Sequence, residues 1–113
     1  MPFEMTEYCF TLDLIDDPLL IEEYEKWHSK VWPEVISSIQ AAGIEAMRIY
    51  RYGNRLMMIM QVNAGYSHER KAALDLGNEK VQQWEQLMWK YQKAVPGAKP
   101  GEKWVQMKKI FEL

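Results

Sequence analysis

The residues best suited to chemistry in this chain are a histidine and two aromatic neighbours. Tyr24, His28 and Trp32 follow one another at intervals of four, which places them on one face if residues 22–34 form a helix. Histidine is the side chain that ordinarily exchanges a proton near neutral pH. An imidazole between two aromatic side chains therefore indicates a small pocket for a proton-transfer group. A core histidine bonded to a backbone carbonyl, with tryptophans that only pack, would fit the same spacing.

The other histidine is a weaker candidate for this role. His68 stands beside Glu69 and Arg70 where a helix is expected to begin, a setting typical of a solvated surface residue. The search for an acid or base that works near neutral pH therefore favours His28.

A second candidate surface follows helical spacing between residues 84 and 91. Trp84, Met88 and Tyr91 share a face, and Trp89 points to one side of it. Such a helix either packs its apolar face on a sheet or offers a platform on which the C–H face of a sugar can stack. The spacing alone leaves both interpretations open.

The composition excludes several classes of function. The 113 residues suit one compact domain, residues 1–113, and a net charge of -2 argues against a nucleic-acid binder. We expect neither a membrane span nor a signal peptide. The single cysteine, Cys9, cannot form an internal disulfide and fits a reducing cytoplasm. Tightly spaced metal ligands, a glycine-rich phosphate loop and a nucleophile elbow are missing from the sequence, so we expect no cofactor.

The elements that must position these residues follow from periodicity and turn signals. Alternation predicts four strands, which are residues 3–14, 45–52, 55–63 and 103–112. The middle two form a hairpin that turns at Tyr52-Gly53-Asn54. Helical spacing predicts a helix over residues 18–42, capped by Asp17 and kinked at Pro33. It also predicts helix over residues 68–93, broken near Gly77-Asn78, where Asn78 can cap the second part.

This order of elements, β-α-β-β-α-β, predicts an α+β fold of the ferredoxin-like class. Its antiparallel sheet would carry both helical segments on one face. Alternation leaves open which side of residues 45–52 meets them, and Met47 and Ile49 suit the core better than Arg48 and Tyr50. Arg48 and Tyr50 would then lie on the opposite face, in a site or in a surface or subunit contact. Because the chain has no further element to cover that face, we predict a homodimer that packs sheet to sheet.

Several of these residues resemble the motifs of the L-rhamnose mutarotase family. The most specific motif is Glu23-Tyr24, His28 and Val31-Trp32-Pro33-Glu34; Ile49-Tyr50 and Trp89-Lys90-Tyr91 add to it. Two further segments, Gly53-Asn54-Arg55 and Pro100-Gly101-Glu102-Lys103-Trp104-Val105, resemble a branch associated with L-fucose. The resemblance covers nearly the whole chain and implies a dimeric α+β barrel built on the ferredoxin-like plan.

The resemblance also implies roles for single residues. His28 would be the proton donor and Tyr24 a sugar-binding residue, while Trp89 matches the second of two adjacent tryptophans that contact sugar. The first of those falls on Met88, and a sugar-binding tyrosine of the family falls on Met47. Because stacking and hydrogen bonding would differ at both positions, the sequence favours L-fucose over L-rhamnose.

The implied reaction interconverts the α and β anomers of a 6-deoxy-L-hexose. An acid protonates the ring oxygen while a base removes the proton of the anomeric hydroxyl, and the open aldehyde rotates before the ring closes. The reaction needs no metal or nucleotide. We assign the acid to His28 and leave the base open between Tyr24, a backbone carbonyl and a bound water. The methyl group of the sugar would lie on Trp32 or Met47.

Two other functions fit the same fold. A cofactor-free monooxygenase or small-molecule lyase would act on a flat aromatic or polyketide substrate and would need a pocket that is apolar throughout. A sensing or binding module would take up sugar without changing its anomer exchange. The pairing of Tyr24 with His28 favours the enzyme.

Overall fold

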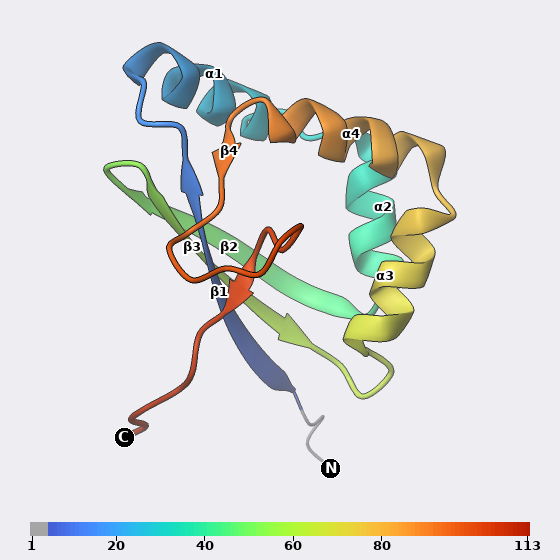
Figure 1. Ribbon diagram of the computed structural model, residues 1–113. Helices are drawn as coiled ribbons and strands as arrows, with labels where there is room; N and C mark the ends of the chain where they lie inside the picture. Colours follow the sequence, from blue (N-terminus) through green and yellow to red (C-terminus); the bar gives the residue numbers. More distant parts are fainter. Residues whose placement is uncertain (1–4) are drawn as a thin grey trace.

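The computed structural model describes residues 5–113 and shows an α+β fold (Figure 1). Residues 3 and 4 of the first predicted strand lie outside the described residues. The helices and strands, in chain order, are β1 (Thr6–Leu14), α1 (Pro18–His28), α2 (Pro33–Ala41), β2 (Ile44–Tyr52), β3 (Arg55–Val62), α3 (His68–Leu76), α4 (Glu79–Trp89), β4 (Gln92–Lys93) and β5 (Val105–Gln106).

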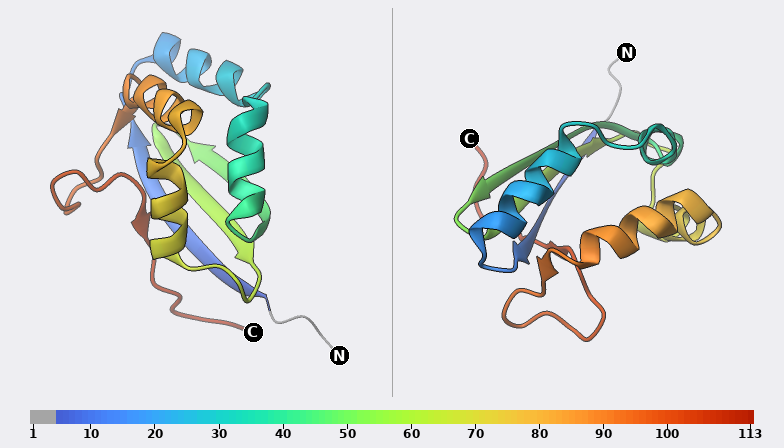
Figure 2. Two further views of the ribbon diagram at one scale, coloured as in Figure 1. Left: turned by 90° about the vertical axis from the view of Figure 1, so that its right-hand side faces the viewer. Right: turned by 90° about the horizontal axis from the view of Figure 1, so that it is seen from above.

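The sheet has the strand order and directions of the ferredoxin-like fold. Its order is β2-β3-β1-β4, β5 also pairs with β1, and every pairing is antiparallel. The helices gather over one face of this sheet (Figure 2). The predicted fold class is confirmed. None of the helices in the described part of the chain is long and apolar enough to cross a membrane.

The predicted helix over residues 18–42 is wrong in one respect, because it ends at His28 and a second helix begins at Pro33, where only a kink was expected. Proline disfavours helical backbone in the residue before it, and Trp32 has φ -58° and ψ 136°. Pro33 then begins α2 at its first position, where its missing N–H costs nothing. Trp32 therefore does not continue the helical face of Tyr24 and His28.

The predicted strand over residues 103–112 is also too long. Only Val105–Gln106 is strand, because the free edge of β1 is divided between two short partners. β4 pairs with Asp13 and Leu14, whereas β5 pairs with Phe10 and Thr11. The helix predicted to reach residue 93 ends at Trp89 for the same reason, since Gln92 and Lys93 are needed for the sheet.

Other local predictions are confirmed. Asp17 caps α1, and the Oδ1 atom of Asn78 accepts hydrogen bonds from the first backbone N–H groups of α4. The hairpin turns at Gly53, whose φ of +59° is a conformation that glycine adopts without strain.

The core lies between the sheet and the helices. Met47 and Ile49 pair with Met60 and Met58 on the helix-covered face, as predicted. The buried apolar residues of the two clusters are Leu14, Tyr24, Val35, Ile44, Leu56, Met58, Met60, Val62, Trp84, Met88 and Tyr91. On the opposite face of β2, Tyr50 is 52% exposed.

Candidate active site

His28 is the last residue of α1 and is bonded through one ring nitrogen. Its Nδ1 lies 2.9 Å from the backbone oxygen of Tyr24. A carbonyl oxygen only accepts hydrogen bonds, so Nδ1 carries a hydrogen and donates it. The other nitrogen, Nε2, has no partner among the hydrogen bonds of residues 5–113. It can accept a proton when the ring is neutral and donate one when the ring is cationic.

Tyr24 packs directly beside this histidine. The centroids of the two rings are 4.4 Å apart, and Tyr24 is 3% exposed. Burial raises the pKa of the Tyr24 hydroxyl, and the smaller effect of a hydrogen bond from Gln92 opposes it. The hydroxyl therefore keeps its proton near neutral pH, which makes it a hydrogen-bonding group and a poor base.

Trp84 packs between His28 and Trp32, the tryptophan that was predicted to lie near this histidine. This side chain comes from α4, and its ring meets the rings of His28 and Trp32 at centroid distances of 5.7 Å and 5.2 Å. Trp27 packs on the same indole at 6.3 Å. Periodicity placed Trp84 on the same helix face as Met88 and Tyr91, but no local signal could show that it separates His28 from Trp32.

The remaining predicted site residues fall into three different surroundings. Met88 is buried in the cluster that contains Tyr24 and Trp84. Met47 packs on the neighbouring cluster, around Met58 and Met60. Trp89 is 44% exposed, and its ring faces the ammonium group of Lys103 at 4.3 Å. The structure thus gathers Tyr24, His28, Trp32 and Met88 around Trp84, with Met47 adjacent and Trp89 on an outer surface.

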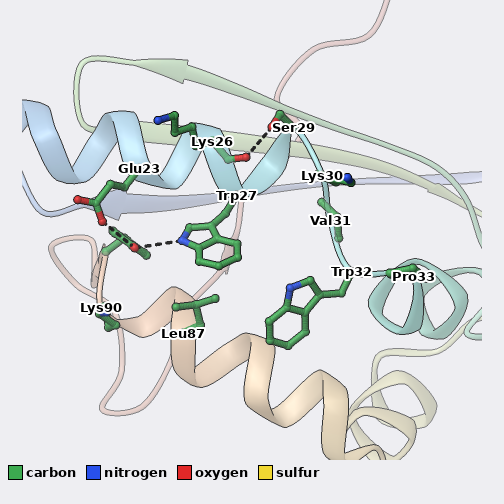
Figure 3. A pocket seen from close by; sticks show the side chains of 11 residues that line it. Glu23, Lys26, Trp27, Ser29, Lys30, Val31, Trp32, Pro33, Leu87 and Lys90 are labelled. Atoms are coloured by element: carbon green, nitrogen blue, oxygen red, sulfur yellow. Dashed lines mark hydrogen bonds between the residues drawn. The ribbon is translucent and has the colours of Figure 1, made fainter.

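An open groove of ≈ 880 Å³ lies beside this cluster, between α1, the connection of residues 29–32 and α4 (Figure 3). Trp27 and Trp32 point from α1 and the connection toward α4. Trp32 and Tyr91 belong both to the groove wall and to the cluster around Tyr24. The lining residues are Glu23, Lys26, Trp27, Ser29, Lys30, Val31, Trp32, Pro33, Leu87, Lys90 and Tyr91.

A chain of hydrogen bonds at this groove links α1 to the residue that follows α4. Trp27 Nε1 donates to Tyr91 Oη at 3.1 Å, and Tyr91 Oη donates to a carboxylate oxygen of Glu23 at 3.0 Å. These bonds tie the last turns of α1 to Tyr91, which lies just after α4, so they help to fix the helix end that carries His28. Sequence reasoning missed this chain because the partners are more than 60 residues apart.

Comparison with known proteins agrees with the resemblance seen in the sequence. The family model described as L-rhamnose mutarotase matches residues 7–113. The chain belongs to the L-rhamnose mutarotase family. The L-fucose mutarotase of Xanthomonas campestris pv. campestris is 51% identical over 111 residues, which cover 96% of this chain and 89% of that protein.

Solved structures agree on the fold. An L-rhamnose mutarotase from Formosa agariphila superposes with a TM-score of 0.71 at 18% identity, covering 96% of this chain and 98% of the other. A dimeric ferredoxin-like protein from an uncultured marine organism has a TM-score of 0.56 at 12% identity, with 99% and 94% covered. At these identities the likeness concerns the fold alone.

Proposed function

We propose that this mutarotase interconverts the α and β anomers of a 6-deoxy-L-hexose, with L-fucose preferred over L-rhamnose. The observation that carries the assignment of the acid is the bonding of His28, whose Nδ1 is held by a backbone oxygen while Nε2 has no partner in the described chain. Two observations support L-fucose. One is the 51% identical relative named L-fucose mutarotase. The other is the presence of Met47 and Met88 where the rhamnose-type pattern has aromatic residues.

His28 is the proton donor of the proposed reaction. Its protonated Nε2 gives a proton to the ring oxygen, and the bond between that oxygen and the anomeric carbon breaks. The anomeric hydroxyl loses its proton to a base as its C–O bond becomes the aldehyde double bond. Rotation about the adjacent C–C bond exposes the other face of the aldehyde. Ring closure then returns both protons, so that only the anomeric configuration has changed.

The burial of Tyr24 supports a base other than this tyrosine. A tyrosine acts as a base only when ionised, and burial raises the pKa of Tyr24 and keeps it protonated. A backbone carbonyl is a very weak base and cannot pass a proton on. Water is also weak, but it can relay the proton to solvent, so a bound water is the base that we propose, and Tyr24 serves to hold a sugar hydroxyl.

The sugar-binding surface that we propose consists of Tyr24, Trp32, Met47, Met88 and Trp89. Trp32 and Met88 support this assignment because they pack with Tyr24 around Trp84. Trp32 or Met47 would contact the methyl group of the sugar, an apolar group that gains from leaving water. The alternative of a monooxygenase has less support, because the buried Tyr24 and Gln92 and the half-buried His28 place polar groups where an apolar pocket is required.

A homodimer formed through the open face of the sheet is the assembly that we propose. Tyr50 on that face is 52% exposed, and Met57 and Ile59 are half-buried there. The segment after β5 leaves the sheet and exposes Ile110 and Phe111 (Figure 1). A second copy of the chain would cover these apolar side chains. The single cysteine supports a reducing cytoplasm as the location.

Saturation-difference proton NMR of anomer exchange tests the proposed reaction. Each sugar, L-fucose and L-rhamnose, is measured with and without the protein, and we expect the larger acceleration for L-fucose. Equal or greater acceleration for L-rhamnose would contradict the sugar preference. Sugar binding without any acceleration would support a binding module instead of an enzyme.

A further inference from the structure

Gln92 carries a buried oxygen that no group of the described chain satisfies. The residue is 8% exposed, and its Oε1 atom has no hydrogen-bond partner. The large majority of buried side-chain polar atoms in proteins are paired, because an unpaired one loses its hydration without compensation. An oxygen left in this state is a candidate for binding a group that the chain itself does not supply.

The position of Gln92 brings its side-chain amide next to Tyr24. Gln92 pairs with Leu14 across the antiparallel ladder, and paired side chains lie on the same face of a sheet. Leu14 is buried in the cluster that includes Tyr24, on the helix-covered face. The amide Nε2 of Gln92 reaches the Tyr24 hydroxyl at 3.5 Å, so the two polar side chains meet inside the core.

The Tyr24 hydroxyl complements the unpaired oxygen. Its own oxygen accepts from Gln92, and its hydrogen has no acceptor among the hydrogen bonds of residues 5–113. A free donor therefore lies beside a free acceptor. Rotating the Gln92 amide by half a turn would pair Oε1 with Tyr24 and leave Nε2 unpaired instead, so the amide has one unsatisfied atom in either orientation.

We propose that Tyr24 and Gln92 form a subsite for one secondary hydroxyl of the sugar, which accepts from Tyr24 and donates to Gln92 Oε1. This inference rests on the proposed function and adds a specificity-determining residue to it. A hydroxyl fits because it donates and accepts through one atom, whereas an anionic group would satisfy Tyr24 only. His28 packs on the ring of Tyr24, so the bound hydroxyl would belong to the molecule that His28 protonates.

The subsite would contribute to the choice between sugars. L-fucose and L-rhamnose differ in the direction of two ring hydroxyls. A sugar whose hydroxyl points away would leave the polar atoms of Tyr24 and Gln92 buried and without partners. Such a penalty lets a binding site reject the wrong sugar strongly. Sequence reasoning could not find Gln92, because it fell inside the predicted helix over residues 68–93 and glutamine is usually a solvated residue.

The test combines one substitution with three altered sugars. Gln92→Met keeps an unbranched side chain but removes both polar atoms. We expect the Kd for L-fucose, titrated directly, and the KM for anomer exchange to rise about tenfold. We expect Tm to change little, because loss of the hydrogen bond to the Tyr24 hydroxyl offsets removal of the unpaired buried oxygen. The same titrations are made with 2-deoxy-, 3-deoxy- and 4-deoxy-L-fucose on wild type and variant.

One deoxy sugar should identify the hydroxyl. Wild type should bind that sugar about tenfold more weakly than L-fucose. Gln92→Met should bind it as wild type does, because the hydroxyl that Gln92 would accept from is already missing from this sugar. If the variant weakens all three deoxy sugars as much as it weakens L-fucose, the subsite is wrong. An unchanged Kd with a lowered Tm would show that Gln92 is structural and would also overturn the proposal.

Gln82→Met is the matched control. Gln82 is a half-buried glutamine of α4 whose Nε2 donates to the backbone oxygen of Asp75 at 2.8 Å. Its replacement should lower Tm and leave Kd and KM unchanged, the opposite of the result expected for Gln92→Met. A wild type that binds L-fucose without accelerating exchange contradicts the proposed function alone, since the Kd comparison still decides the subsite. A wild type that binds no sugar overturns both.

Discussion

His28 Nδ1 donates to the backbone oxygen of Tyr24, the residue whose ring it also contacts. One turn of α1 therefore sets both the position of the imidazole and the nitrogen that carries the fixed hydrogen. Proton exchange is left to Nε2. A histidine bonded to a carbonyl was the structural alternative to a catalytic histidine, yet here the same bond prepares the free nitrogen for chemistry.

Replacing His28 should abolish most of the catalysed exchange. In His28→Asn the amide cannot donate and recover a proton at neutral pH, so we expect the acceleration of anomer exchange to fall by about 10²–10⁴-fold. Saturation-difference NMR measures this directly. His68→Asn is the control, because His68 is exposed at the start of α3. If His28→Asn keeps the wild-type rate, the assignment of the acid is wrong.

Stability should decrease at alkaline pH. Burial raises the pKa of Tyr66 to about 12, with smaller contributions from Tyr8 and Asp75, and burial also raises the pKa of Tyr24. An unfolded tyrosine ionises near pH 10. Above that pH the folded state binds more protons than the unfolded state, so the free energy of unfolding falls as pH rises. Below about pH 10 these tyrosines contribute their full stabilisation to the folded state.

Urea unfolding between about pH 8 and about pH 11 measures this effect. Tyr66→Phe should flatten the decline, although modestly, because Tyr66 is partly exposed and solvent screens it. Tyr52→Phe is the control, since Tyr52 is 91% exposed and should leave the slope unchanged. An unfolding midpoint that does not change over this range would contradict the prediction.

Asn78→Ala should destabilise the helix that carries Trp84. Its Oδ1 accepts from the backbone N–H groups of Lys80 and Val81 at 3.1 and 3.2 Å, and alanine cannot replace these bonds. Loss of such a cap costs about 1 kcal/mol of unfolding free energy. Ser37→Ala on the exposed side of α2 should change it by less than about 0.5 kcal/mol. Equal effects of the two substitutions in urea unfolding would contradict the role of Asn78.

A charge on the open face of the sheet should separate the proposed dimer. Ile59 pairs with Cys9 and Arg48 on that face, so Ile59→Lys would place an ammonium group in the interface. Sedimentation velocity should show a dimer for wild type and a monomer for the variant. Ile36→Lys adds the same charge on α2, where Ile36 is 40% exposed, and should stay dimeric. A monomeric wild type would rule the assembly out.

The parts of the fold that local chemistry determines were predictable from the sequence. Alternation located β1 and the β2–β3 hairpin, and Gly53 marked the turn, because both signals concern residues close together in the chain. The caps of α1 and α4 were predictable for the same reason. Proline rules allowed either a kink or a break at Pro33, and the extended backbone of Trp32 accompanies its packing on Trp84, a residue from a distant helix.

The parts that depend on competition or distant contacts were not predictable. Apolar and polar residues do alternate over residues 103–112. However, β4 and β5 both pair with the same edge of β1, and the sequence does not show how that edge is divided. In the candidate site, spacing found Tyr24 and His28 because they are one turn apart. The contact of Trp84 with His28 and that of Gln92 with Tyr24 join residues 56 and 68 positions apart, respectively, and only the folded chain brings them together.

The break between α1 and α2 also affects which changes in length the protein can accept. In a continuous helix, one residue inserted after His28 would turn every later side chain by about 100° and would misplace the whole of α2. Here residues 29–32 form a connection without helical periodicity, and residues 29 and 30 are exposed. An extra residue there can lengthen the connection without rotating α2, because α2 begins separately at Pro33. The wall of the groove can thus diverge between relatives while the proton-transfer histidine keeps its place.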